Sequence, residues 1–430
     1  MRQFERIFLG RSVTMGFDDD ANVCWQGQKK VKILWVKPGK LLPLDSGGKL
    51  RTYNILRHLA VIHEVTYLSY YLGVEDEDYE REILRHVPGT ISISSGKRES
   101  HGLTRLVEYL RRLPDSIPYS VSRFASSRVR RMIGDWMSQR RFDVVVCDFL
   151  ASAPNFPQAL PNPCVLFQHN VESVLWKRRA MFATRWADRV VASIESHKMS
   201  RYEPKQVRRF HHVLAVSETD RRAMSSMTDP ARLSVVPTGV DLSLYKFDPQ
   251  LRPAMPLVVF TGSMDWEPNI DGVEYFCREI WPLVLRRVPA ARFRIVGRDP
   301  DPRVRRLACA SVEVTGTVPA ITDHLREAAA LVVPLRMGGG TRLKIYEGMA
   351  LGKATVSTSV GAEGLDVRHE RDILLADDPA QFGDYLVHVL LDENLRRMYE
   401  ASAAATAQRY DWSEIAKQFA VQLLAVARSS

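Results

Sequence analysis

The sequence predicts an α/β protein of two doubly wound domains, each a parallel sheet with helices on both faces. Three observations lead to this prediction. The chain has 430 residues, whereas one domain typically has roughly 100–200. Short valine-rich runs alternate with helical stretches in both halves of the chain. A segment rich in Gly, Asp and Pro interrupts this alternation between the halves. Ligands of such sheets bind beyond the carboxyl ends of the strands, so we expect the site in the cleft that the two domains face.

The first half contains a strand, loop, helix, strand unit. Its expected elements are a strand at 31–36, a helix at 49–60 and a strand at 64–69. Three further apolar runs, each followed by a polar loop, occur at 143–147, 163–167 and 213–217. Residues 31–240 are therefore expected to form the first Rossmann-like domain, on the acceptor side. Residues 1–30 have neither an uninterrupted apolar segment nor a cleavage pattern, and are expected to be an extension outside the fold.

The second half repeats this architecture with a different sequence. We expect the linker at 241–256, within TGVDLSLYKFDPQLRPAMP, because this segment lacks periodicity and holds several residues that cannot continue a helix. The expected elements that follow are strands at 257–261, 292–296, 312–314 and 331–334, and helices at 270–287 and 322–329. The second domain is expected at 257–410. Residues 411–430 are expected to form a C-terminal helix that packs back on the first domain.

The composition excludes several classes of protein. Hydrophobic residues at 45% and charged residues at 26% are typical of a folded globular chain and exclude a disordered or collagen-like one. The apolar runs are far shorter than the ~18 residues of a membrane-spanning helix. The five cysteines are scattered without C-x-x-C spacing, which favours a reducing compartment and a cytoplasmic protein. The net charge of +10 predicts an anionic partner, but no nucleic-acid-reading module is present, so no nucleic acid is expected.

The segment from Pro334 to Leu365 is the most informative part of the sequence. It reads PLRMGGGTRLKIYEGMALGKATVSTSVGAEGL. The residues that follow the strand and open a helix are Gly338, Gly339, Gly340 and Thr341, and Gly352 is expected to end that helix. Glycines allow a ligand to approach the backbone closely, and the N-terminus of a helix favours a phosphate. This pattern predicts a phosphate site at the start of the helix.

Two charged residues on this helix are expected to address the same ligand. At about 100° per residue, Lys344 and Glu347 fall within ~60° of each other on one face. With a pyrophosphate at Gly340, Lys344 can neutralise it, and Glu347, ~10 Å further along, can accept hydrogen bonds from ribose hydroxyls. Arg342 points more nearly away, yet near the helix end it can still reach the phosphates. The alternative is an ordinary surface ion pair beside a flexible glycine loop.

Several motifs in one order extend this interpretation to the whole chain. They are FQHNVES, AVSETDR, VVPTGVDLSLY, FTGSMDWEPNIDG and GGGTRLKIYEGMALGKATVST. From about Lys32 onward the chain resembles the retaining GT-B glycosyltransferases of family 4, especially sugar transferases of bacterial polysaccharide clusters. The resemblance implies a nucleotide-diphosphate-sugar donor as co-substrate, a saccharide or lipid-linked acceptor, retention of anomeric configuration and no cofactor.

The resemblance also implies roles for individual residues. Glu347 corresponds to the second glutamate of the family's E-x7-E motif, which holds the donor ribose, whereas the first glutamate falls at Gly339. Gly262 and Ser263 lie in the donor loop after the linker. There the family's phosphate-binding Arg and Lys are replaced by Ser263 and Asn269. These replacements shift the phosphate contacts to the two basic residues after the glycines.

The first half supplies two more candidate sites. Ser46 precedes Gly47 and Gly48 at a helix start, a position suited to an N-cap and an anion. This loop resembles the family's first glycine-rich loop, which borders the donor phosphates and the acceptor; a plain tight turn is the alternative. His169 follows an expected strand together with Asn170 and matches the histidine with which family members touch the donor sugar. The alternative for His169 is a plain hydrogen-bonding residue.

The expected chemistry needs positive charge at the leaving group. Glycosyl transfer builds negative charge on the β-phosphate, which Lys344, Arg342 and the helix N-terminus can stabilise. No D-x-D pair is placed to hold a metal, because Asp18 to Asp20 lie in the extension, so no metal is expected. Two other functions remain open, namely a GT-B nucleotide-sugar epimerase or phosphorylase, and a non-catalytic assembly protein that binds a nucleotide sugar.

Two basic amphipathic stretches raise the question of a membrane. Apolar residues recur at helical spacing over Val129 to Met137 and over Leu103 to Leu113, with arginines between them. Such helices can lie on an anionic membrane, where a lipid-linked acceptor would be found, so we expect a peripheral contact at the inner face of the plasma membrane. The alternative is a solvated face over an ordinary core.

Overall fold

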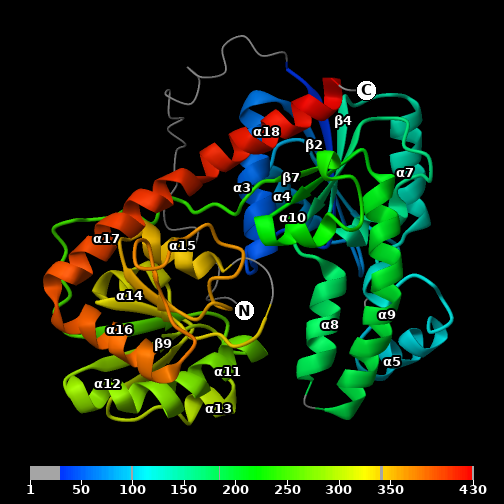
Figure 1. The fold of residues 1–430 in the computed structure, drawn as a ribbon. Coiled ribbons are helices and arrows are strands. Elements are labelled where there is room, and N and C mark those ends of the chain that lie inside the picture. The colour runs from blue at the N-terminus through cyan, green and yellow to red at the C-terminus, as the bar shows by residue number, and fades with distance from the viewer. Residues whose placement is uncertain (1–29, 98–99, 184, 339–341, 429–430) are drawn as a thin grey trace.

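The computed structural model describes residues 30–428 apart from 98–99, 184 and 339–341. The described chain forms two parallel sheets, which confirms the predicted α/β class with two doubly wound domains (Figure 1). The extension at 1–30 lies outside the described residues except for its last position.

The first domain is a seven-stranded sheet in the order β3-β2-β1-β4-β5-β6-β7. Its strands are β1 Lys32–Pro38, β2 Glu64–Tyr71, β3 Thr90–Ser94, β4 Val144–Asp148, β5 Cys164–Gln168, β6 His212–Ala215 and β7 Leu233–Val235. Its α-helices are α3 Gly47–Ile62, α4 Glu77–His86, α5 Gly102–Arg111, α6 Tyr119–Ser122, α7 Ser127–Ser138, α8 Glu172–Phe182, α9 Trp186–Arg209 and α10 Glu218–Met224. The 3-10 helices are Leu150–Asn155 and Pro230–Arg232. Side chains alternate across β1, so Ile33 and Trp35 pack on one face and Leu34 and Val36 on the other.

The second domain is a six-stranded sheet in the order β10-β9-β8-β11-β12-β13. Its strands are β8 Leu257–Thr261, β9 Arg292–Val296, β10 Val312–Gly316, β11 Ala330–Val333, β12 Ala354–Ser357 and β13 Leu374–Leu375. Its α-helices are α11 Glu267–Tyr275, α12 Trp281–Arg287, α13 Pro302–Arg305, α14 Ile321–Glu327, α15 Leu343–Ala350, α16 Pro379–Leu391 and α17 Glu393–Ala407, and a 3-10 turn at Gln408–Tyr410 precedes α18 Trp412–Arg428.

One expected helix of the second domain is divided. The single helix expected at 270–287 is instead α11, a π-helical turn at Phe276–Ile280 and α12. Pro282 near the start of α12 has no N–H to donate to the preceding turn, so the hydrogen-bond pattern widens there.

The last helix returns to the first domain. In Figure 1 the red α18 runs from the second domain to the first, and the Phe419 ring stacks on Trp35 at 5.1 Å between ring centroids. At the crossing, the Val240 N–H donates to the Tyr410 carbonyl at 2.7 Å, and the Trp412 N–H donates to the Val240 carbonyl at 3.2 Å. The two domains are therefore tied by two chain crossings that hydrogen-bond to each other.

The two amphipathic stretches have different environments. On α7 the apolar side chains Val129, Ile133 and Met137 are fully buried in the first domain's core. The expectation that this face could meet a membrane is wrong, because the face is already covered. The apolar side chains of α5 are exposed instead. Within the described part of the chain, no helix combines the length and apolar character that a membrane crossing needs.

Candidate active site between the two domains

Lys344 lies in the first turn of α15. The helix begins at Leu343 rather than at Gly340, because Arg342 has φ −87° and ψ 83°, which are not helical angles. The Lys344 Nζ donates to Asn269 Oδ1 at 3.0 Å and lies 4.0 Å from the centroid of the Phe260 ring. Burial lowers the pKa of Lys344 to about 7. The predicted glycine-loop residues Gly339, Gly340 and Thr341 lie outside the described residues.

A second cation lies near Lys344. Asn269 Nδ2 donates to the Ser263 carbonyl at 2.9 Å, and the exposed Arg298 donates through Nε to Ser263 Oγ at 2.7 Å. Hydrogen bonds thus connect Lys344, Asn269, Ser263 and Arg298 in a row, which we call the cation row. A Cβ at Gly262 would lie 2.6 Å from Asn269 Nδ2 and 2.9 Å from Lys344 Nζ, so this position needs glycine.

Sequence reasoning missed Arg298. The residue is the second after β9, and it therefore stands at the carboxyl edge of the sheet where ligands of such domains bind. Its place just after a predicted strand is the sequence signal that could have identified Arg298 as a ligand-binding residue. Its hydrogen bond to Ser263 places an arginine at the position where the family resemblance had indicated a lost basic residue.

The other two charged residues of the glycine block are engaged within the protein. Glu347 hydrogen-bonds with the Tyr245 hydroxyl, and burial raises the pKa of the Glu347 carboxyl. A ribose hydroxyl would have to share or replace that bond. Arg342 is almost fully buried, and burial lowers its pKa to about 10, against the opposing attraction of Glu363.

The first glycine loop touches the second domain. A Cβ added to Gly47 would lie 3.1 Å from Leu343 Cδ1, at the opening turn of α15. A Cβ at Gly48 would lie 2.7 Å from the Phe149 ring. Ser46 stands at the N-cap of α3 as expected, but its side chain makes no capping hydrogen bond. The structure therefore places the first glycine loop against the opening turn of α15, across the cleft.

His169 belongs to a buried network. Its Nδ1 lies 2.8 Å from Arg51 Nη1 and its Nε2 lies 2.6 Å from Asp148 Oδ1. Arginine can only donate, so Nδ1 accepts and Nε2 carries the proton that Asp148 accepts. The ring stacks on Phe149 at 3.8 Å, and burial lowers the pKa of His169 to about 4. Only 2% of His169 is exposed and both nitrogens have protein partners, so its side chain does not open onto the cleft in this state.

Asp148 is the centre of that network. It is fully buried and also accepts from Thr52 Oγ1 at 2.6 Å and from Trp35 Nε1 at 3.0 Å. Burial by itself would raise the pKa of Asp148, but the charge of Lys37 and the hydrogen bonds from His169 and Thr52 outweigh it and leave that pKa below its ordinary value. The network orients His169 and closes the carboxyl ends of β4 and β5.

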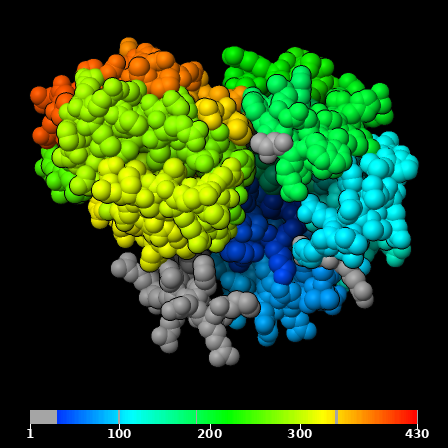
Figure 2. Space-filling model, turned by 90° about the horizontal axis from the view of Figure 1, so that it is seen from below, coloured from blue at the N-terminus to red at the C-terminus, as the bar shows by residue number. Residues whose placement is uncertain are grey.

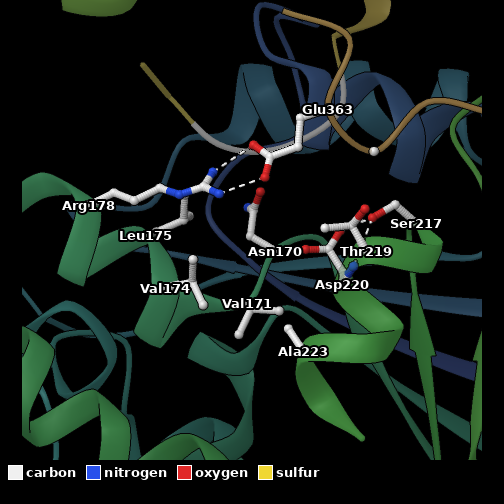
Figure 3. Close-up of a pocket in the computed structure, with 11 residues that line it drawn as sticks. Asn170, Val171, Val174, Leu175, Arg178, Ser217, Thr219, Asp220, Ala223 and Glu363 are labelled. Atoms are coloured by element: carbon white, nitrogen blue, oxygen red, sulfur yellow. Dashed lines mark hydrogen bonds and ion pairs between the residues drawn. The ribbon is translucent and has the colours of Figure 1, made fainter. Parts of the chain in front are cut away.

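A small cavity of about 60 Å³ lies beside this network, between the domains (Figure 3). Its polar lining comes from Asn170, Ser217, Thr219 and Asp220, and its apolar lining from α8 and α10. Arg178 of α8 pairs with both carboxylate oxygens of Glu363, at 2.6 and 2.7 Å, and donates to the Gly338 carbonyl at 2.9 Å. This interdomain ion pair borders the cavity on the second-domain side.

The predicted cleft is visible in Figure 2 as a hollow between the two domains, with the blue N-terminal part of the chain at its base. The glycine loop of α3 and the opening turn of α15 meet within the interdomain contact.

Two family models match the chain, one in each domain. The model described as Glycosyltransferase Family 4 matches residues 46–244, and the model described as Glycosyl transferases group 1 matches residues 255–392.

Curated relatives are similar at lower identity. A phosphatidyl-myo-inositol mannosyltransferase of Mycolicibacterium smegmatis is 26% identical over 325 residues, which cover 70% of this chain and 77% of that protein. The Mycobacterium leprae enzyme of the same name is 29% identical over 216 residues, which cover 48% of this chain and 56% of that protein. This chain thus spans little more than half the length of the second relative.

Solved structures share the two-domain fold. Anabaena HepE in complex with UDP-glucose superposes with a TM-score of 0.63 at 15% identity, covering 92% of this chain and 100% of that one. Sucrose-phosphate synthase of Thermosynechococcus elongatus has a TM-score of 0.68 at 15% identity, covering 93% of this chain and 100% of that one. At these identities the likeness concerns the fold alone.

Proposed function

Since this chain is a GT-B, family 4-like glycosyltransferase, we propose that it transfers a sugar, with retention and without a metal, from a nucleotide-diphosphate donor to a saccharide or lipid-linked acceptor. The proposed setting is the synthesis of a cell-surface polysaccharide. Mannose and glucose donors are the first to test, because a relative is named a mannosyltransferase and a neighbour of the same fold binds UDP-glucose.

The cation row is the observation that carries this proposal. Lys344 and Arg298 present two positive groups at the carboxyl edge of the second sheet, joined by neutral Asn269 and Ser263. A donor diphosphate at this edge would meet both cations and the opening turn of α15, and the N-terminus of a helix favours an anion. The protein groups already bonded to Lys344 hold it in place before the ligand arrives.

The same groups suit the chemistry of transfer. As the bond between the sugar and the diphosphate breaks, negative charge grows on the β-phosphate, and fixed positive groups lower the barrier. We assign this role to Lys344, with Arg298 supporting the diphosphate. Such protein cations can do the work that a divalent metal does in other transferases, which supports the metal-independent proposal.

The acceptor is proposed to enter from the first domain. At about 60 Å³ the cavity next to His169 is too small for a sugar ring, but its amide, two hydroxyls and Asp220 carboxylate can hydrogen-bond individual sugar hydroxyls. Burial raises the pKa of Asp220. A saccharide head on a lipid carrier would use the polar groups here and leave its lipid outside the cleft.

A binding and turnover experiment tests the proposal. Isothermal titration with UDP- and GDP-sugars should identify a donor, and Lys344→Ala should weaken that donor by about 10- to 100-fold, the loss of one hydrogen bond to a charged group. Lys205→Ala, which changes an exposed lysine of α9, is the matched control and should leave the affinity unchanged. Transfer to acceptor that persists in EDTA supports the metal-independent reaction, and NMR of the product reports its anomeric configuration.

The competing functions give different products. An epimerised donor formed without acceptor would support the epimerase, and release by phosphate would support the phosphorylase. A donor that binds in a Lys344-dependent way but is never consumed would support the assembly protein, and no binding of any nucleotide sugar would contradict the proposal.

A further inference from the structure

Helix α5 exposes the apolar side that a solvated helix would bury. The exposed fraction of Leu103 is 79%, and Leu106 and Leu110 are each 52% exposed, whereas Tyr109 is buried. Tyr109 packs edge to face against Tyr119, which anchors the helix to the domain. The apolar side of α5 therefore faces solvent although the helix is held in place.

The turn between α8 and α9 exposes a second apolar group. Trp186 is 80% exposed and Met181 is 64% exposed, with Phe182 and Val190 beside them in sequence. In Figure 1 this turn lies at the free end of the two long helices, with α5 next to it. In Figure 2 the cyan surface that includes α5 and the green surface that includes α8 and α9 lie on one face of the molecule, seen from below.

Basic residues are interspersed with these apolar side chains. The exposed ones are Arg105 and Arg111 on α5, and Lys177, Arg179, Arg185 and Arg189 around the turn. Among the described residues of the two segments, Asp188 is the exposed acid, while Glu108 is paired with Arg112. This combination, which we call the α5–turn surface, has the two properties of a helix that lies at an anionic bilayer interface, large apolar side chains and surrounding cations.

The α5–turn surface continues into the cleft. Phe182 lines a groove of about 330 Å³ together with Arg178, Gly338 and Glu363. Gly338 is the first glycine of the block on the donor side, and Arg178 donates to its carbonyl. A lipid carrier lying against Phe182 would therefore hold its head group near the opening between the domains.

We propose that the α5–turn surface binds the anionic face of a lipid bilayer and thereby positions the opening of the cleft next to the membrane. Charge complementarity favours this occupant over a second copy of the chain, which would bring the same cations together. The lipid-carrier role rests on the proposed function, but the binding to lipid does not.

Vesicle flotation tests the proposal with the full chain. Wild type should float with vesicles of phosphatidylcholine mixed with phosphatidylglycerol, and should stay at the bottom with phosphatidylcholine alone. Each basic residue near the surface is expected to change the partition about fivefold, so added salt should release the protein. The double variant L106S/W186S should lose at least tenfold in partition, because it removes two exposed apolar anchors.

The controls separate the surface from general effects. L391S changes a leucine that is 64% exposed on α16 of the second domain and should float like wild type. Unchanged circular dichroism and nucleotide affinity in L106S/W186S show that the variant is folded, so its loss of flotation reports the surface. Equal binding to neutral vesicles, flotation of L106S/W186S like wild type, or a dimer in size exclusion that this variant abolishes would each overturn the proposal. Flotation without any donor binding would instead retain the surface and reject the transferase function.

Discussion

The two domains share a strand arrangement, but the charged side chains at the cleft have different partners in each domain. In the first domain, Asp148 accepts from His169, Thr52 and Trp35 and is balanced by Lys37 inside the core. In the second, Lys344 and Arg298 are bonded to the neutral residues Asn269 and Ser263. The first arrangement holds a buried carboxylate among its cations, whereas the hydrogen-bonded cation row of the second contains no carboxylate.

This difference indicates that the charged groups of the first domain hold the structure of the cleft, whereas those of the second domain are suited to bind a ligand. A buried carboxylate with several partners is costly to disturb, because removing it leaves its partners' charges buried alone. Cations held by neutral groups, such as the partly buried Lys344 and the exposed Arg298, can accept a phosphate without first losing another ion pair. The comparison assigns orientation of the cleft to the first domain and recognition of the donor to the second.

The largest expected effect tests the first domain. Asp148→Asn keeps the volume but removes the counter-charge of Lys37, and should destabilise the first domain by about 3–5 kcal/mol. Calorimetry, which can resolve the domains, measures the loss. Asp135→Asn, on the exposed side of α7, should change stability by less than about 0.5 kcal/mol. Equal effects of the two substitutions would mean that Asp148 is not the centre of a buried charge network.

The next effect is a pH dependence in the second domain. In the free protein Lys344 has a pKa of about 7, so it is mostly charged below that pH and mostly neutral above it. A bound diphosphate would stabilise the charged form and raise this pKa. Affinity for the nucleotide sugar should therefore fall as pH rises through about 7, by up to about tenfold per unit. Titration calorimetry over this range measures it, with a donor whose bridging diphosphate does not itself titrate there. Lys344→Arg stays charged and should have a flat profile; a slope retained in it would point to another group.

The smallest effect concerns Arg298. Its side chain is exposed, so water screens its contribution, and Arg298→Ala should weaken nucleoside diphosphate binding by about three- to tenfold without changing the affinity for the nucleoside. Competition binding of the two ligands separates these outcomes. Arg306→Ala, which changes an exposed arginine at the end of α13, is the control and should leave both affinities unchanged. A loss that is equal for nucleoside and diphosphate would contradict a phosphate contact.

Local signals were enough for the elements that continuous apolar runs define. The strand at 257–261 coincides with β8, because a strand buried on both faces leaves an uninterrupted apolar run. The strand at 292–296 coincides with β9, in which Arg292 and Arg294 alternate with buried apolar residues. Strand β13 has two residues, too few for a pattern, and β3, TISIS, has only two apolar residues among its five. Among the site residues, Lys344 and the glycines stood out because they are close together in sequence. Arg298 did not, because its partner Ser263 is 35 residues away.

The sequence by itself determined the two-domain α/β architecture, the family and the glycine block with Lys344. These follow from periodicity and from motifs, which are local along the chain. Only the tertiary structure decided that His169 is enclosed by Asp148 and Arg51, that Arg298 joins the cation row, and that α5 is exposed while α7 is covered. Which face of an amphipathic helix meets the core, and which distant charges pair, depend on contacts between separate elements, and no local pattern encodes them.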